Sequence, residues 1–210
     1  MRILDRAGVA APPCLASYYH GVHVWKDVRP QDKCQIRKHL EQMQGRRCAY
    51  CEGPIDTLGQ HIEHFRRKRH FPQLTFGWAN LYWSCNQKDS CGRYKDHGAG
   101  AYAINDLIEP SAEDPDKFFR FRSDGTISIR SGLLPLDEHR ARETLRVFNL
   151  NSDWGRLRHM RKRFVSGYVS LVAGCIGFST TELQDFFEEE LSQAATLPFF
   201  TAIRHVLTEP

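Results

Sequence analysis

The first hydrophobic repeat along the chain predicts a helix over residues 31–44. Apolar side chains recur on one face of this segment at Ile36, Leu40 and Met43. Asp32 is the expected N-cap, because a short acidic side chain can accept a hydrogen bond from the free N–H groups of the first turn. Gly45 follows the last apolar position and favours a helix end there. The segment before it contains several prolines and predicts irregular structure.

The pattern then changes to short apolar runs of the kind that form strands. Residues 60–65 and 81–85 predict two strands, and residues 91–96 predict a short helix that Gly98 ends. Strand, loop, strand and helix in this order form a ββα unit. So small a unit needs a metal ion or a larger scaffold to stay folded.

The remaining pattern predicts a hairpin followed by helices. Apolar positions alternate within residues 117–130, and Asp124-Gly125 is a strong two-residue turn. Residues 136–210 show helical spacing, with a capping box that begins at Ser179 and a last helix expected near Pro198. We therefore expect an α+β fold.

Four parts of the chain follow from these elements. They are an N-terminal arm and helix (1–45), a ββα core (46–100), a hairpin or connector (101–135) and a helical C-terminal region (136–210).

Composition and charge narrow the class of protein. The 210 residues are 41% hydrophobic and carry 29 Lys and Arg against 25 Asp and Glu, which is ordinary for a globular domain. We expect a cytoplasmic protein. A membrane span is not expected, since no run of about 18 apolar residues occurs, and a secretory signal is not expected, because charged side chains interrupt the first residues before an apolar core forms. The distribution of charge is more informative than its sum. Residues 66–69 are all cationic, whereas 182–190 hold five acids and no base.

The seven cysteines predict a metal site rather than disulfides, because their number is odd and no export signal is visible. Cys48 and Cys51 form a C-x-x-C pair, and Cys85 and Cys91 form a wider second pair. Four thiolates on two such turns suit a tetrahedral Zn²⁺. Buried free thiols and a redox C-x-x-C remain the alternatives. The other three cysteines, Cys14, Cys34 and Cys175, are expected to be buried.

Candidate catalytic residues lie within the ββα segment. His64 can accept a proton near neutral pH and so act as a general base. Glu63 offers hard oxygen ligands to Mg²⁺ or Mn²⁺. Asn80 can tie the loop between the strands. Further candidate ligands of the catalytic ion are His61, Asp96 and His97, although His61 could equally be a packing residue.

Cationic residues near His64 are candidates for contact with nucleic-acid phosphates. They are Arg66, Arg67, Lys68, Arg69 and Lys95. A solvated loop is the alternative interpretation of the run at 66–69. A second basic stretch, at 156–163, is expected to form the wet face of a helix.

Several strings of the ββα segment together resemble one family. They are Cys48-Ala49-Tyr50-Cys51, His61-Ile62-Glu63-His64, Asn80-Leu81, Cys85, Cys91 and Lys95. This set is similar to the HNH (ββα-metal) endonucleases, and more closely to the HNH proteins of retron and Septu-type anti-phage systems. The motif-level resemblance covers residues 46–97, about a quarter of the chain.

The resemblance implies a structural zinc on the four cysteines, His64 as the base, Glu63 as a metal ligand and Asn80 as the family asparagine. It also implies metal-dependent hydrolysis that leaves a 5′-phosphate and a 3′-hydroxyl. Gly92 departs from the pattern, because many relatives have a metal-binding His or Asn there.

The implied partner is an ABC/SMC-like ATPase that restrains the nuclease, joined in a retron system by a reverse transcriptase and its RNA–DNA hybrid. Two other functions remain open. The same site could act on RNA such as tRNA, or the chain could be a non-catalytic zinc module that binds nucleic acid or protein.

Overall fold

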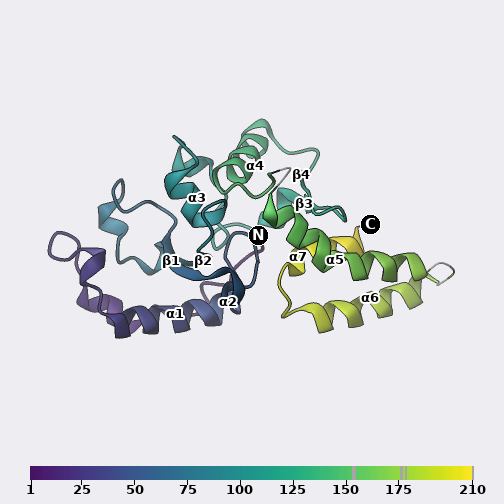
Figure 1. The fold of residues 1–210 in the computed structure, drawn as a ribbon, viewed down its shortest axis with the longest axis horizontal. Coiled ribbons are helices and arrows are strands. Elements are labelled where there is room, and N and C mark those ends of the chain that lie inside the picture. Colours follow the sequence, from purple (N-terminus) through teal and green to yellow (C-terminus); the bar gives the residue numbers. More distant parts are fainter. Residues whose placement is uncertain (153–154, 176, 178, 210) are drawn as a thin grey trace.

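A two-stranded hairpin and one short helix form the centre of the fold (Figure 1). The computed structural model describes residues 1–152, 155–175, 177 and 179–209. Strand β1 (Gln60–His64) pairs antiparallel with β2 (Leu81–Cys85), and α3 (Cys91–His97) follows. The predicted ββα order and the α+β class are confirmed.

The register of the hairpin places the candidate residues on its two faces. Glu63 lies opposite Tyr82, and His61 lies opposite Ser84. Because successive side chains of a strand alternate, His61 and Glu63 share one face and His64 starts on the other. The N–H of Gly92 donates to Ser84 Oγ at 3.2 Å. This bond seats the first turn of α3 on the face that carries Glu63.

Helix α1 (Pro30–Gln44) packs along β2, on the side away from α3 (Figure 1). The Gln44 side chain joins the two elements, because its Nε2 donates to the Trp83 carbonyl at 2.9 Å and its Oε1 accepts from the Trp83 N–H at 2.9 Å. The helix ends at Gly45, whose φ of 60° is the left-handed conformation that favours glycine.

The expected N-cap of α1 is wrong. Arg29 occupies the cap position and makes no side-chain cap, while Asp32 is the third residue of the helix, in its first turn. The Asp32 carboxylate instead accepts from Tyr18 OH at 2.6 Å and from Arg29 Nε at 2.7 Å. It therefore fixes the N-terminal arm to α1.

Short helical segments fill the connections. Helix α2 (Ile55–Leu58) lies between the first cysteine pair and β1. Single 3-10 turns occur at Pro13–Ser17, Trp25–Asp27, Pro72–Leu74, Trp78–Asn80, Ile104–Asp106 and Pro115–Lys117. None of these turns was predicted, because each is too short to show a hydrophobic period.

The second half of the chain contains the predicted hairpin and helices. Strands β3 (Phe119–Phe121) and β4 (Ile127–Ile129) pair antiparallel, and α4 (Pro135–Val147) follows them. Helices α5 (Arg156–Gly174) and α6 (Thr180–Ala194) lie side by side and extend away from the ββα unit (Figure 1). The predicted capping box is confirmed, since Ser179 and Glu182 bond each other reciprocally at the start of α6.

Helix α7 (Phe200–Thr208) begins two residues later than predicted. Pro198 is not in its first turn, because Phe199 takes a left-handed conformation with φ 57° and becomes the N-cap. The N–H of Phe199 donates to the Glu52 carbonyl at 3.1 Å, and the N–H of Thr201 donates to Glu52 Oε2 at 3.0 Å. The loop of the first cysteine pair thus holds the start of α7.

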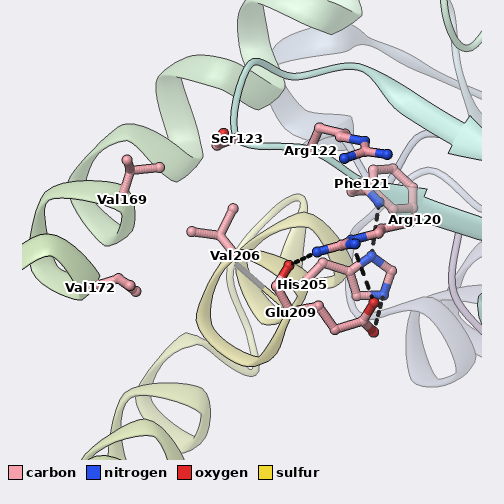
Figure 2. Close-up of a pocket in the computed structure, with 9 residues that line it drawn as sticks. All are labelled: Arg120, Phe121, Arg122, Ser123, Val169, Val172, His205, Val206 and Glu209. Atoms are coloured by element: carbon pink, nitrogen blue, oxygen red, sulfur yellow. Dashed lines mark hydrogen bonds and ion pairs between the residues drawn. The ribbon is translucent and has the colours of Figure 1, made fainter.

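The other side of α7 is anchored to β3 (Figure 2). His205 Nδ1 accepts the Phe121 N–H at 2.9 Å, and its Nε2 donates to Asp116 at 2.5 Å. A cavity of about 190 Å³ remains between β3, α5 and α7, with Val169, Val172 and Val206 among its lining residues. None of its lining residues belongs to the ββα unit, so we treat this cavity as part of the C-terminal packing.

Two burial predictions from the sequence are wrong. Cys34 is exposed, and Cys14 and Cys175 are only partly buried. Arg161, expected on a wet helix face, is 1% exposed because it lies on the inner side of α5 in line with Leu157. No helix among the described residues has the length and apolar character needed to cross a bilayer.

Candidate active site

Four cysteines from three parts of the fold converge beside the hairpin. Cys48 and Cys51 lie on the loop after α1, Cys85 ends β2 and Cys91 begins α3. All four are buried, and their sulfur atoms lie within 4.8 Å of one another. Tetrahedral zinc with Zn–S bonds of about 2.3 Å needs sulfurs about 3.8 Å apart. The donor set and its spacing therefore fit a structural zinc ion.

A buried guanidinium lies near this cluster. Arg161 donates from Nε to the Gly125 carbonyl and from Nη2 to the Leu150 carbonyl, both at 2.8 Å. Burial lowers the pKa of Arg161 to about 10, while the Cys51 and Cys91 thiolates act in the opposite direction. Four thiolates on one Zn²⁺ would carry a net charge of −2, and this cation on α5 would partly balance that charge.

Glu63 is the buried carboxylate of the candidate site. It is 2% exposed, with Lys95 Nζ 2.9 Å from its Oε1 and His61 Nε2 3.1 Å from its Oε2. Burial acts to raise the pKa of Glu63, but Lys95 and His61 outweigh it and hold this pKa well below its usual range. Glu63 is therefore ionised at neutral pH.

Lys95 joins two carboxylates. Its ammonium is fully buried and also lies 2.6 Å from Asp96 Oδ1. Arg67 Nε donates to the same Asp96 oxygen at 3.1 Å. The predicted contact between Lys95 and a nucleic acid is wrong, because a side chain with no exposed surface cannot reach a phosphate.

Gly92 leaves the space that the Glu63 carboxylate occupies. A Cβ atom at this position would lie 2.5 Å from Glu63 Oε2 and 2.6 Å from its Cδ. The absence of a ligand side chain after the fourth cysteine thus has a steric reason: the two groups cannot occupy the same place.

The His64 ring has one nitrogen bonded to the backbone. Nε2 lies 2.9 Å from the Thr75 carbonyl, which can only accept, so Nε2 carries the proton and Nδ1 has the free electron pair. Lys68 Nζ lies 3.3 Å from Nδ1, and the Trp25 ring meets the imidazole edge-on at 4.5 Å. Burial and the charge of Lys68 lower the pKa of His64 to about 4.

Asn80 ties the loop that follows His64. Its Oδ1 accepts the Arg66 N–H at 2.7 Å, and its Nδ2 donates to the carbonyls of Arg66 and Leu74 at 3.0 and 3.1 Å. The side chain is 1% exposed. These bonds fix the loop whose Thr75 carbonyl orients His64.

The four cationic side chains after His64 contact different partners and do not form one patch. Arg66 pairs with Glu109 at 2.8 Å, and Arg67 lies over the Tyr102 ring at 4.6 Å. Lys68 lies at His64, and Arg69 is an exposed side chain whose Nε donates to His70 at 3.0 Å. Lys68 and Arg69 are therefore the cations of this run that face open space near the imidazole.

Two further candidate ligands differ in position. His61 contacts Glu63 directly, and its Nδ1 is buried without a hydrogen-bond partner. His97 is exposed, and at 100° per residue it lies about 140° around α3 from Gly92. The structure thus places His61 at the carboxylate and turns His97 away from it.

Carboxylate oxygens are the ligands that a Mg²⁺ or Mn²⁺ ion would need near Glu63. Two carboxylates, Glu63 and Asp96, flank one cation, the Lys95 ammonium, and Glu63 Oε1 makes an ion pair but no hydrogen bond. Apart from the cysteines, no set of three potential ligands in the described ranges is close enough to hold an ion. Mg²⁺ is often held by only one or two carboxylates plus substrate phosphate, so this donor set fits.

Comparison with known proteins adds two relatives. Over 123 residues the chain is 27% identical to a protein of Vibrio cholerae serotype O1 biovar El Tor whose name provisionally designates it the HNH endonuclease of retron Vc95. Over 90 residues it is 29% identical to the Septu protein PtuB of Bacillus thuringiensis. The chain resembles proteins named for a retron and for Septu. No family model matches it.

These matches are partial. The first covers 55% of this chain and 57% of the relative, and the second covers 42% of this chain and 33% of the relative. The chain thus aligns with about half, or less, of the relatives' length.

Proposed function

We propose that this protein is a metal-dependent HNH endonuclease that hydrolyses nucleic-acid phosphodiester bonds, with DNA as its substrate. The observation that carries the proposal is the arrangement at the end of β1. A neutral imidazole whose Nδ1 carries no proton and an ionised, buried carboxylate come from adjacent residues, His64 and Glu63, beside four clustered cysteines. The retron relative, whose name provisionally designates it an HNH endonuclease, supports the same activity.

His64 acts as the general base in this proposal. Its Nδ1 takes a proton from the attacking water, while the Thr75 carbonyl holds the ring in the required tautomer. The low pKa of His64 keeps the ring neutral at pH 7, so Nδ1 carries no proton before the reaction. Lys68, 3.3 Å from Nδ1, is placed to attract the substrate phosphate.

Glu63 and Asp96 are the proposed ligands of a catalytic Mg²⁺ or Mn²⁺, with His61 as the residue that orients Glu63. When bound, such an ion stabilises the negative charge that develops on the phosphate and on the leaving oxygen. Gly92 keeps the space at Glu63 open, and Asn80 keeps the loop at His64 fixed.

Cleavage assays test this proposal. Purified protein with its full zinc content is incubated with DNA and with RNA in Mg²⁺, in Mn²⁺ and in EDTA. We expect cleavage that requires one of the two ions and leaves 5′-phosphate ends. Failure to cleave either nucleic acid in any of these conditions would contradict the proposal. Cleavage of RNA alone would show that RNA is the substrate in place of DNA, and the proposed chemistry would be unchanged.

We further propose that the nuclease is the effector of an anti-phage system and that its C-terminal helices dock onto an ABC/SMC-like ATPase. In a retron system a reverse transcriptase and its RNA–DNA hybrid would complete the assembly. Support comes from the names of the two relatives and from α6, which extends away from the ββα unit (Figure 1). Its acidic face would repel nucleic acid, so a protein partner suits it better.

Charge reversal on α6 tests this docking. Asp185, Glu188 and Glu189 are exposed, so their replacement by lysine should leave the fold intact. Truncation is a poorer test, because α7 contributes buried side chains such as Ile203 and Leu207 to the core. We expect the triple variant to lose co-purification with the ATPase while it retains nuclease activity. Undiminished co-purification would contradict the assignment of this face.

A further inference from the structure

A groove of about 520 Å³ opens beside His64 and is not used by the chemistry described above. One wall is the segment from His20 to Trp25 in the N-terminal arm, and the other is the loop after β1, including Lys68 and Arg69. The volume lies within the range of about 300–1,000 Å³ that is typical of ligand sites. The groove joins two segments that are more than 40 residues apart in the sequence.

The groove lies next to the candidate active site. Three of its lining residues contact the His64 ring: Trp25 edge-on at 4.5 Å, Lys68 with Nζ 3.3 Å from Nδ1, and Thr75 through its carbonyl. A molecule in the groove would therefore touch residues that themselves contact the His64 ring, Lys68 at Nδ1 among them.

The two walls differ in chemistry. Val22 and Val24 are 74% and 61% exposed, and together with Trp25 they form an apolar wall that faces the cations Lys68 and Arg69. A nucleotide has the same division, with an uncharged, flat base and an anionic phosphate. Sites for single-stranded nucleic acid combine these two features: a surface for bases and a cationic track for the backbone.

The arm is held in position by local bonds. Asp27 Oδ2 accepts the Val24 N–H at 2.7 Å, His23 Nδ1 accepts the Tyr19 N–H at 3.2 Å, and Trp25 stacks with Phe76 at 6.3 Å. The apolar wall is thus built into the fold before any ligand binds.

A second groove, of about 490 Å³, is lined by Arg67, Phe71 and Tyr102 among others. Arg69 lines both grooves. A strand that leaves the first groove can therefore pass this guanidinium and enter the second.

We propose that the groove between the 20–25 segment and the loop after β1 binds the unpaired base next to the scissile phosphate, so that the substrate is single-stranded nucleic acid or an unpaired stretch within a duplex. In a duplex the base faces are stacked inside, and a base reaches such a wall only after it leaves the stack. This inference rests on the proposed nuclease function and adds the class of its substrate.

To test this inference, the binding of nucleic acid is measured separately from its cleavage. The probes are a 12-nucleotide single-stranded DNA, the same sequence as RNA, and the matching DNA duplex, bound to full-length His64→Ala protein in fluorescence anisotropy. We expect at least a tenfold preference for the single strands over the duplex. The double variant Val22→Glu, Val24→Glu should weaken single-strand binding about tenfold or more. The matched control is Leu134→Glu, Leu136→Glu, whose side chains are 70% and 66% exposed at the start of α4, and it should bind normally.

Crosslinking gives a second readout on the wild-type protein. A strand that carries 5-iodouracil at one position should crosslink to the peptide that contains Trp25. Equal affinity for duplex and single strand, or unchanged binding by the Val22 and Val24 variant, would overturn the inference. If the wild-type protein cleaves no nucleic acid while these binding results hold, the proposed function fails, and the groove remains a binding site for single strands without a scissile phosphate beside it.

Discussion

At the scale of single residues, the relation between Gly92 and Glu63 is the sharpest steric constraint of the site. A methyl group at Gly92 would meet the Glu63 carboxylate at 2.5 Å, so one of the two must move. The carboxylate is the more mobile group, and if Glu63 holds the catalytic ion as proposed, its displacement by about 1 Å would reduce turnover about 100-fold.

Gly92→Ala is therefore expected to lose about two orders of magnitude in turnover and to keep its zinc. Cleavage rates and metal content of the purified variant measure the two effects separately. Gly167→Ala on α5 is the matched control, because a Cβ there has no neighbour within 4 Å and its activity should be unchanged. Wild-type turnover in Gly92→Ala would show that Glu63 does not take part.

Predictions for single residues succeed where they depend on nearby positions in the sequence. They fail where tertiary packing determines whether a side chain is buried. The four cysteines could be grouped from their spacing alone. Arg161 could not be recognised as buried from its charge, because cations usually face solvent. Its position four residues after Leu157 and four before Val165 was the available signal, since all three belong to one buried stripe.

At the scale of elements, the Asp116 carboxylate is one of the groups that attach α7 to the rest of the fold. Burial acts to raise the pKa of Asp116, but hydrogen bonds from His205 and Arg204 outweigh it and hold this pKa well below its ordinary value. A carboxylate with a depressed pKa stabilises the folded state above its unfolded pKa of about 3.9, and this stabilisation is lost as pH falls below that value.

We thus expect the melting temperature of the wild-type protein to fall steeply between about pH 4 and pH 2. Asp116→Asn should melt lower than wild type at pH 7 and should lose less of its stability over the same acid range. Parallel thermal melts of the two proteins from pH 7 to pH 2 measure this. Identical acid profiles would show that Asp116 does not anchor α7.

Element boundaries show what a local pattern can and cannot predict. The strand at 81–85 and the end of α1 at Gly45 were predicted correctly, because both depend on short-range signals. The start of α7 was not, since Glu52, some 150 positions away in the sequence, supplies the cap for Phe199 and Thr201. The turn that carries Trp25 also has no recognisable signal in the sequence. The groove wall beside His64, which this turn forms, could therefore not be predicted.

At the scale of the whole molecule, the cysteine cluster joins the loop after α1, the hairpin and α3. Because so small a unit has little core of its own, a zinc ion at this junction would supply much of its folding free energy. Cys85→Ser should therefore lose zinc and unfold at markedly lower denaturant concentration.

Metal analysis and denaturant unfolding measure the two consequences. Cys34→Ser is the matched control, because this cysteine is exposed and lies outside the cluster. It should match wild type in both assays. A Cys85→Ser protein with wild-type zinc content and stability would show that no zinc ion at this cluster stabilises the fold.

The central claim is that His64 activates water for attack on a phosphodiester, and His64→Ala tests it most directly. The variant is compared with wild type and with His139→Ala, a half-exposed histidine on α4, at equal zinc content and with trace nuclease excluded. We expect cleavage to be abolished in His64→Ala and unchanged in His139→Ala, with both proteins folded. Undiminished cleavage by folded, zinc-loaded His64→Ala protein would contradict the account.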